Sequence, residues 1–453
     1  MESNLSRKKI AVAGIGFISV IYITLAGYLI ASGMSALLFM APIIAFIIVL
    51  IALRMPIILL TIVAFFIPLE SYVTFQGASV NRYLIILLLA VWLFDHLVRK
   101  KPFEIARASW FMIFWVGFAL LSYFWGPAIG GFFNYFFGFL LALILMVITP
   151  DMISNQKHLT WVLLAFMTGI LIFLVVWFIF GANDIHGFYI PIIGESKVSE
   201  VGTALGWGTA CLLALALFSP SKKIFAISIP LLAIAVYLFL VTALRRNFLT
   251  IPFVVLGLLV FQKKPSWRAI WILAILFLMA WLGWNIIFPA LPSVIKNRFL
   301  MRTIVESGGT GRIELYALAY NLFQGSPLFG VGLGGYQVFA GSMIGRATFA
   351  HNAYLEVLSQ TGLIGFILWG GAVWLVSIGL IRAYNSCENN ADRIILAIPL
   401  ALLLFMIVNG TVDGYENYRP FWFALGLGLA ATNIVYPHTN LPKRVTDQNL
   451  PVQ

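Results

Sequence analysis

Residues 236–255 read VYLFLVTALRRNFLTIPFVV, and the adjacent Arg245 and Arg246 are the only charged residues in this stretch. The apolar runs on either side of the arginines, at 224–243 and 247–262, each come close to the ~20 residues that an α-helix needs to cross a bilayer. The stretch therefore predicts two membrane-spanning helices joined by a short connection that carries two positive charges.

Apolar runs of this kind recur along the whole chain. Of its 453 residues, 62% are hydrophobic and only 10% are charged, whereas soluble domains are about 45–50% apolar and about 25% charged. This composition excludes a water-soluble enzyme. We predict an all-α polytopic membrane protein with about 12–14 transmembrane helices. The candidate runs are 10–32, 34–53, 56–69, 82–98, 109–126, 130–149, 159–181, 201–219, 224–243, 247–262, 267–288, 363–381, 394–412 and 420–436.

The basic residues favour one orientation in the membrane. If the N-terminus is cytoplasmic, most of the 28 Lys and Arg residues fall in the inside connections, as the positive-inside rule requires. Both termini are then cytoplasmic. Because the net charge of +12 is explained by topology, it implies no nucleic-acid partner.

This orientation divides the chain into four parts. Residues 1–288 form N-terminal transmembrane helices that include the Arg245/Arg246 hairpin. Residues 289–362 form one large periplasmic loop with short helices. Residues 363–436 form C-terminal transmembrane helices, and residues 437–453 form a cytoplasmic tail.

Positive charges collect on the outer side of this topology, at Arg245 and Arg246 and in the large loop. A single interfacial arginine can be explained by snorkelling, but two adjacent arginines that face a basic loop favour an anion site. The planar guanidinium presents a fork of donors that fits phosphate oxygens. We therefore predict an anion site at the outer leaflet, with diphosphate as the candidate ligand. The basic residues of the loop are Lys296, Arg298, Arg302, Arg312 and Arg346.

Three segments of the large loop have recognisable local structure. Residues 307–323, SGGTGRIELYALAYNLF, predict a Gly-rich turn that leads into a helix, either an ordinary turn or a helix start suited to phosphate. Residues 325–335, GSPLFGVGLGG, predict a tight turn or a close backbone approach. After His351, Asn352 is expected to cap a short helix that Gly362 ends. His351 itself is either a structural hydrogen-bonding residue or a catalyst.

Together these segments resemble the C-terminal signature of the O-antigen ligase and Wzy-type polysaccharide polymerase superfamily. The resembling pieces are Gly311-Arg312 with Tyr316, the stretch 326–337 and the stretch 351–365. Residues 242–245 resemble the Thr-x-Ser-Arg of the family, with Leu244 where serine is common. The resemblance covers about residues 235–380. One departure is residues 195–208, ESKVSEVGTALGWG, which lack the arginine or Pro-Asn pair of relatives and in which Lys197 can substitute.

The resemblance implies a membrane glycosyltransferase of the C type that uses neither a metal nor another cofactor. Such an enzyme lies in the bacterial inner membrane and works on the periplasmic face. Its partners are an undecaprenyl-diphosphate-linked glycan as donor, a sugar hydroxyl of a glycan or of lipid A-core as acceptor, and membrane lipid.

The roles of the candidate residues follow from the charge that develops on a leaving diphosphate, which positioned cations stabilise. His351 is either the general base toward the acceptor hydroxyl or one more phosphate ligand. Glu314 is the alternative base, unless it pairs with a nearby arginine. The expected diphosphate ligands are Arg245, Arg246 and Arg312, with Arg298 and Arg302 as weaker candidates.

Several functions remain open at this point. Within the superfamily, the same donor chemistry serves a ligase that transfers a finished glycan to lipid A-core, a polymerase that joins lipid-linked repeats, and a protein oligosaccharyltransferase. From another class, a flippase for lipid-linked oligosaccharides needs a polar central cavity, whereas the polar residues here gather on one outer face. A non-catalytic assembly scaffold is a further alternative.

Overall fold

The computed structural model describes residues 50–70, 73–75, 78–128, 130–183, 189–191, 198–219, 221–241, 245–260, 267–290, 312–345, 347–387, 390–414 and 418–435. The chain divides into two compact units, Met1–Leu59 and Leu60–Gln453. The predicted helices at 10–32 and 34–53 lie almost entirely outside the described residues, as do Lys197, Arg298, Arg302 and the tail 437–453.

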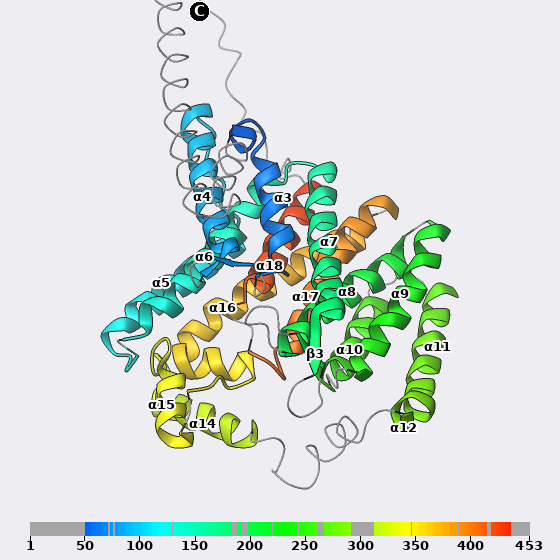
Figure 1. The fold of residues 1–453 in the computed structure, drawn as a ribbon. Coiled ribbons are helices and arrows are strands. Elements are labelled where there is room, and N and C mark those ends of the chain that lie inside the picture. The colour runs from blue at the N-terminus through cyan, green and yellow to red at the C-terminus, as the bar shows by residue number, and fades with distance from the viewer. Residues whose placement is uncertain are drawn as a thin grey trace, which may run out of the picture. The chain divides into compact units, whose positions relative to one another are not determined.

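Helices make up most of the described chain (Figure 1). Each apolar helix begins within a few residues of a predicted apolar run, because such a run can satisfy its backbone in lipid only as a helix. The exception is the helix that begins at Ala353, ten residues before the run predicted at 363–381. The apolar helices are α3 (Pro56–Phe66), α4 (Val80–Arg99), α5 (Arg107–Leu121), α6 (Phe132–Met152), α7 (Gln156–Phe180), α8 (Val198–Phe218), α9 (Lys222–Val241), α10 (Arg245–Val260), α11 (Trp267–Leu282), α16 (Ala353–Ser386), α17 (Asn390–Asn409) and α18 (Arg419–Val435).

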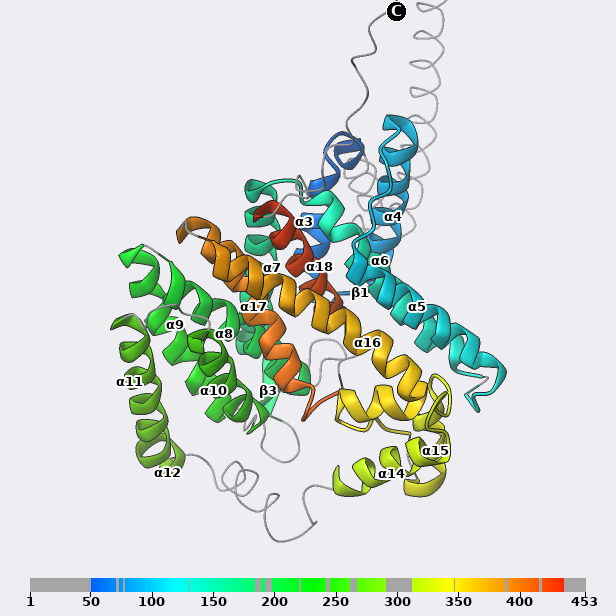
Figure 2. The ribbon, with the colours of Figure 1, turned by 180° about the vertical axis from the view of Figure 1, so that it is seen from behind.

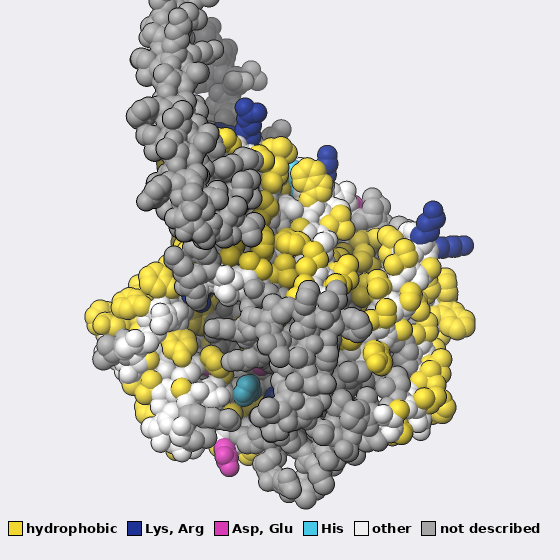
Figure 3. Space-filling model, viewed as in Figure 1, with side chains coloured by type: hydrophobic (Ala, Val, Ile, Leu, Met, Phe, Trp, Pro, Cys, Tyr) yellow, Lys and Arg dark blue, Asp and Glu magenta, His cyan; other side chains and the backbone are white. Residues whose placement is uncertain are grey.

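The predicted fold class, an all-α polytopic membrane protein, is confirmed. Within the described ranges, 8 helices are long and apolar enough to cross a membrane, and shorter apolar helices accompany them. The total number of spans stays a prediction because residues 1–49 are not described. In the view of Figure 3, hydrophobic side chains cover much of the visible described surface, and most of the visible Lys and Arg side chains project at the upper edge.

Short elements complete the described chain. A 3-10 turn (Ser122–Phe124) follows α5, and a π-helical turn (Gly283–Ile287) with α12 (Phe288–Ala290) follows α11. Two antiparallel hairpins are present: β1 (Thr74–Phe75) with β2 (Ala78–Ser79), and β3 (Gly181–Asn183) with β4 (Tyr189–Pro191). In register, Phe75 faces Ala78 and Ala182 faces Ile190.

Helix α18 lies within the packed centre of the second unit. It packs against α6, α16 and α17, and Phe421, Trp422 and Phe423 are completely buried. The Trp422 ring contacts that of Trp115 on α5, with centroids 5.8 Å apart. Figure 2 shows the long α16 crossing in front of α17 and α18. This packing holds the ends of α16, α17 and α18 at fixed positions, and the candidate site is built on those ends.

The segment between α12 and the long α16 contains the short helices that the sequence predicts. Helices α14 (Arg312–Gly325) and α15 (Gly335–Ile344) pack on the first turns of α16. Their shared core is a cluster of buried apolar side chains: Leu315, Leu318, Ala319, Tyr336, Ala340 and Ala350. The Tyr336 hydroxyl donates to Leu315 O at 3.1 Å, and burial together with the charge of Glu356 raises the pKa of this tyrosine. The described part of the large loop from Arg312 onward is therefore a packed layer with its own core.

Candidate active site

Arg312 and His351 both bind the turn that connects α17 to α18. Arg312 Nη1 donates to Val412 O at 3.0 Å, and His351 Nδ1 lies 3.7 Å from Asp413 Oδ1. The Tyr316 hydroxyl, one helical turn after Arg312, donates to His351 O at 3.3 Å. The turn therefore brings the two principal candidates from the large loop to one place.

The backbone of His351 adopts an uncommon conformation. Its φ is +53°, a left-handed value that most residues with a Cβ avoid. The next residues are held on the same turn, because Asn352 Nδ2 donates to Thr411 O at 3.2 Å and Ala353 N donates to Gly410 O at 2.9 Å. The predicted N-cap is confirmed: Asn352 Oδ1 accepts from Leu355 N at 3.0 Å. These bonds fix the direction of the imidazole.

The two side chains of the His351–Asp413 pair differ in exposure. The imidazole is 39% exposed and the Asp413 carboxylate only 9%. A separation of 3.7 Å is longer than a hydrogen bond but short enough for a charge interaction. When Nδ1 carries a proton toward Asp413, Nε2 is the ring nitrogen left to accept another. The pair thus combines an accessible imidazole with a carboxylate behind it.

The two other candidates of the large loop that are described are Arg312 and Glu314. Arg312 is half-buried at the first position of α14, and its bond to Val412 uses one of the five N–H donors of a guanidinium. Glu314, in the first turn of the same helix, is exposed. Among the residues with a described position, its carboxylate has no ion-pair partner. Their proposed roles remain predictions.

Arg245 and Arg246 are the first two residues of α10, but their side chains are outside the described part of the chain. The next residue, Asn247, is completely buried, and its Nδ2 donates to Gly202 O in α8 at 2.7 Å. This bond fixes the start of α10 against α8. Whether these arginines share a ligand with Arg312 stays a prediction, as do the roles of Arg298 and Arg302.

The glycine-rich turn at 325–335 lies against the kink of α16, as the predicted close approach requires. Gly362 has φ +61° and ψ −166°, so the helix is interrupted there, and a Cβ on it would lie 2.3 Å from Leu328 O. Gly330, with φ +69°, would bring a Cβ within 2.4 Å of the Gln360 carbonyl carbon. Leu363 N donates to Pro327 O at 2.8 Å across this contact. Only glycine fits at either position.

Sequence reasoning missed two carboxylates at this site. The first is Asp413, and the sequence feature that could have revealed it is an acidic residue in a short polar connection between two apolar runs. The second is Glu356, which is 0% exposed. Its Oε1 accepts from Gln337 Nε2 at 2.6 Å and from Gln360 Nε2 at 3.2 Å, and its Oε2 accepts from Ala350 N at 3.1 Å. A glutamate between the apolar residues of a short helix was the available signal.

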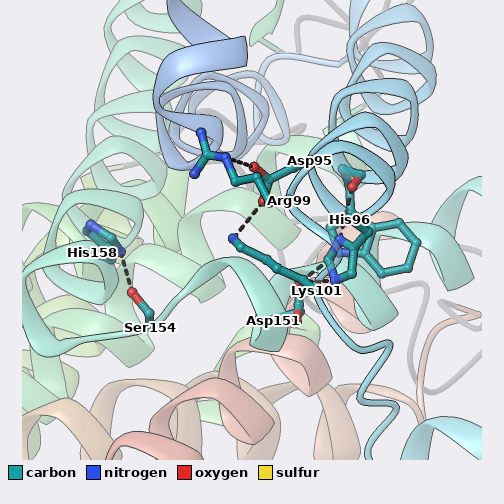
Figure 4. A network of polar contacts seen from close by, with 8 residues as sticks. Asp95, His96, Arg99, Lys101, Asp151, Ser154 and His158 are labelled. Carbon is teal, nitrogen blue, oxygen red and sulfur yellow. Dashed lines mark hydrogen bonds and ion pairs between the residues drawn. The ribbon is translucent and has the colours of Figure 1, made fainter.

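Asp95 and His96 belong to a separate polar cluster at the end of α4 (Figure 4). Lys101 Nζ and Arg99 Nε lie 2.6 and 2.8 Å from the Asp95 carboxylate. His96 Nε2 lies 3.4 Å from Asp151 Oδ2 on α6. Asp95 and His96 therefore have their charge partners within this cluster, on α4, on α6 and just after α4.

Another buried charge lies at the start of α18. The Arg419 guanidinium pairs with Glu70 and donates to Ser79 Oγ at 3.1 Å, and Ser79 Oγ donates to Glu70 at 3.0 Å. This group ties α18 to the β1–β2 hairpin. In the described ranges, no three His, Cys, Asp or Glu side chains gather as metal ligands do, and metal independence itself stays a prediction.

Comparison with known proteins covers the part of this site that precedes the 410–413 turn. Residues 207–370 match a family model, Wzy_C, described as O-Antigen ligase. The matched segment runs from α8 into α16 and contains Arg312, His351 and Glu356. A search of curated proteins gave no match. Over residues 207–370 the chain is therefore similar to the O-antigen ligase family, which supports a place in the O-antigen ligase and Wzy-type superfamily.

Proposed function

We propose that this protein transfers a glycan from undecaprenyl diphosphate to a sugar hydroxyl of lipid A-core on the periplasmic face of the bacterial inner membrane. The observation that carries the proposal is the meeting of Arg312 and His351 on the 410–413 turn. A cation suited to phosphate and an accessible base are what this transfer needs. The family match supports the glycosyltransferase class.

The reaction breaks the bond between the sugar C1 and the diphosphate oxygen, and the electron pair stays on that oxygen. Arg312 stabilises the growing negative charge, with Arg245 and Arg246 as further clamps and Arg298 and Arg302 as weaker ligands. Preorganised donors of this kind stabilise charge most where water is excluded. No metal takes part in this scheme.

The acceptor hydroxyl forms the new bond to C1 and gives its proton to His351 Nε2. The Asp413 carboxylate faces Nδ1, so it orients the ring and compensates the positive charge that the imidazole acquires. Glu314 is the alternative base because it is exposed in the first turn of α14. The alternative role for His351 is to bind phosphate.

Turnover by purified protein in liposomes, with a defined lipid-linked donor, tests the proposal. We expect Arg312→Ala to lower kcat by about 10²–10³-fold, the usual loss for one charge-stabilising donor, while the protein remains inserted. Arg382→Ala, at an exposed position on α16 far along the helix from the kink, is the matched control. Near-normal turnover by Arg312→Ala would show that Arg312 does not stabilise the leaving diphosphate.

The identity of the acceptor is tested in cells that lack this protein. Accumulation of long undecaprenyl-linked chains indicates a ligase. Loss of long chains, with single repeats still attached to lipid A-core, indicates a polymerase instead. Adding each acceptor in turn to the reconstituted protein distinguishes a ligase or a polymerase from a protein oligosaccharyltransferase.

A further inference from the structure

A cavity of about 250 Å³ lies between the connection that follows α5 and the start of α15. The two sides are bonded together, because Leu333 N donates to Ser122 Oγ at 2.9 Å. They also approach closely at Gly334, where a Cβ would lie 3.0 Å from the Ala128 Cβ. The residues that line the cavity are Pro127, Ala128, Gly130, Gly131, Tyr135, Gly334, Gln337, Val338 and Ala347.

Gln337, in the wall of this cavity, holds a buried side-chain amide whose orientation is fixed by Glu356. Its Nε2 donates to the Glu356 carboxylate at 2.6 Å, and because a carboxylate only accepts, the amide cannot be turned the other way. Its Oε1 is left without a hydrogen-bond partner among the described residues, although the side chain is 95% buried, at 5% exposure. Buried acceptors are nearly always paired, so Gln337 lacks a donor that a ligand can supply.

The charges around the cavity favour a neutral ligand. Among the described residues that line it, none is a Lys or an Arg, and the buried Glu356 carboxylate lies directly behind Gln337. Glu356 would therefore repel an anion, which would find no cationic partner among the described residues of the wall. Tyr135 adds a phenol that can donate or accept, and the remaining walls are apolar or glycine. A neutral compound with several hydroxyl groups matches this combination.

The cavity is connected to His351 through two hydrogen bonds. Glu356 holds Gln337 through Oε1 and accepts from Ala350 N, the residue before His351, through Oε2 at 3.1 Å. Ala347, in the same connection, is part of the cavity wall. A ligand in the cavity therefore lies beside the segment that positions the base.

We propose that this cavity binds an uncharged sugar residue of the acceptor, with Gln337 Oε1 accepting from a sugar hydroxyl and Glu356 acting as a positioning residue. The inference rests on the proposed function, because it assigns the acceptor to the side of the site next to His351. The diphosphate donor, which is anionic, binds instead at the arginines.

Filling the cavity tests the proposal without disturbing the core. A Cβ added at Gly130 meets nothing within 4 Å, so we expect Gly130→Trp to fold and to occupy the space. It should raise the KM for the acceptor about tenfold or more, the effect of losing roughly 1.4 kcal/mol of binding, and leave the KM for the donor unchanged. Gly325→Trp, which also meets nothing within 4 Å and lies outside the cavity, should behave as the unmodified protein.

Tyr135→Phe is a second variant that removes only a hydroxyl, and it should raise the acceptor KM by a smaller factor than Gly130→Trp. An unchanged acceptor KM in Gly130→Trp, or an equal rise in donor KM, would overturn the proposal. If Gly130→Trp has no effect while Arg312→Ala abolishes transfer, the sugar site fails and the proposed function stands. If Arg312→Ala also leaves transfer intact, the proposed function fails.

A direct binding measurement uses methyl glucoside and methyl glucuronide, which differ by one carboxylate. Saturation-transfer NMR on the full-length protein in detergent should detect the neutral glucoside, and the signal should disappear in Gly130→Trp but not in Gly325→Trp. The glucuronide should give a weaker signal because of the Glu356 carboxylate. Equal signals from both glycosides in every variant contradict the proposal.

Discussion

At the scale of single residues, His351 is distinguished by its backbone as well as its ring. A φ of +53° costs free energy for a residue with a Cβ, and Asn tolerates it better than other residues do. Replacements of His351 therefore differ in what they remove. Alanine removes the imidazole and retains the backbone strain. Asparagine also removes the imidazole but tolerates the left-handed φ.

We expect His351→Asn and His351→Ala both to lose turnover, by about 10²–10⁴-fold if the ring is a general base. His351→Ala should also be the less stable of the two, by about 1 kcal/mol. Turnover at pH 6–8 and thermal unfolding in detergent measure the two effects separately. Unchanged turnover in His351→Asn would show that the imidazole has no catalytic role.

Asp413 is expected to act through His351. Asp413→Asn keeps the size of the side chain and removes its charge, so kcat should fall by at least about tenfold, or roughly 1.4 kcal/mol of transition-state stabilisation, while the donor KM stays the same. Asp392→Asn, an acid bonded to Gln156 at 3.1 Å in another part of the chain, is the control. A rise in donor KM with unchanged kcat contradicts a positioning role.

At the scale of elements, the kink in α16 joins the long apolar part of this helix to the layer that α14 and α15 form. The helix is interrupted at Gly362, so its first turns carry Asn352 and Glu356 in one direction and its remainder crosses the bundle in another. The glycine-rich turn occupies the space at the kink, and its backbone bonds to the carbonyls of Ser359 and Gln360 at 2.9 Å. The kink and the turn therefore stabilise each other.

We expect Gly362→Ala to destabilise the protein by more than about 1 kcal/mol, because an alanine is strained at this φ and its Cβ overlaps Leu328 O. Gly370→Ala is the matched control on the same helix: its Cβ meets nothing within 4 Å, and replacing a mid-helix glycine stabilises by roughly 0.5–1 kcal/mol. Thermal unfolding of the two variants in the same detergent should show shifts of opposite sign. An unchanged or raised unfolding temperature in Gly362→Ala would show that the glycine at the kink is not needed.

At the scale of the whole molecule, the distribution of charge predicts which side of the membrane each connection occupies. Both native cysteines, Cys211 and Cys387, are buried, so single exposed cysteines report topology. Glu314→Cys should react with a membrane-impermeant maleimide in intact cells whose outer membrane is permeable to it. Lys222→Cys, at the start of α9, should react only after the inner membrane is opened. The reverse pattern would overturn the positive-inside orientation and place the site in the cytoplasm.

Local features of the molecule could be predicted from the sequence, because each depends on residues close together in the chain. Apolar runs predicted the helices, since lipid leaves the backbone no other way to satisfy its polar groups. Asn352 predicted its own cap, and the glycines of 325–335 predicted a close approach. Gly362 was expected to end a short helix, but its contact with that turn could not be predicted because it joins distant segments of the chain.

Which residues come together at the site was decided only by the tertiary structure. Arg312 and His351 meet at the turn 410–413, where Arg312 donates to Val412 O and Asn352, the residue after His351, donates to Thr411 O. A backbone carbonyl is present at every residue, so it carries no sequence signal. Asp413 and Glu356 became site residues through contacts with chain segments far from their own. The amino-acid sequence by itself determined the helices, the caps and the turns, whereas long-range packing decided which polar groups face one another.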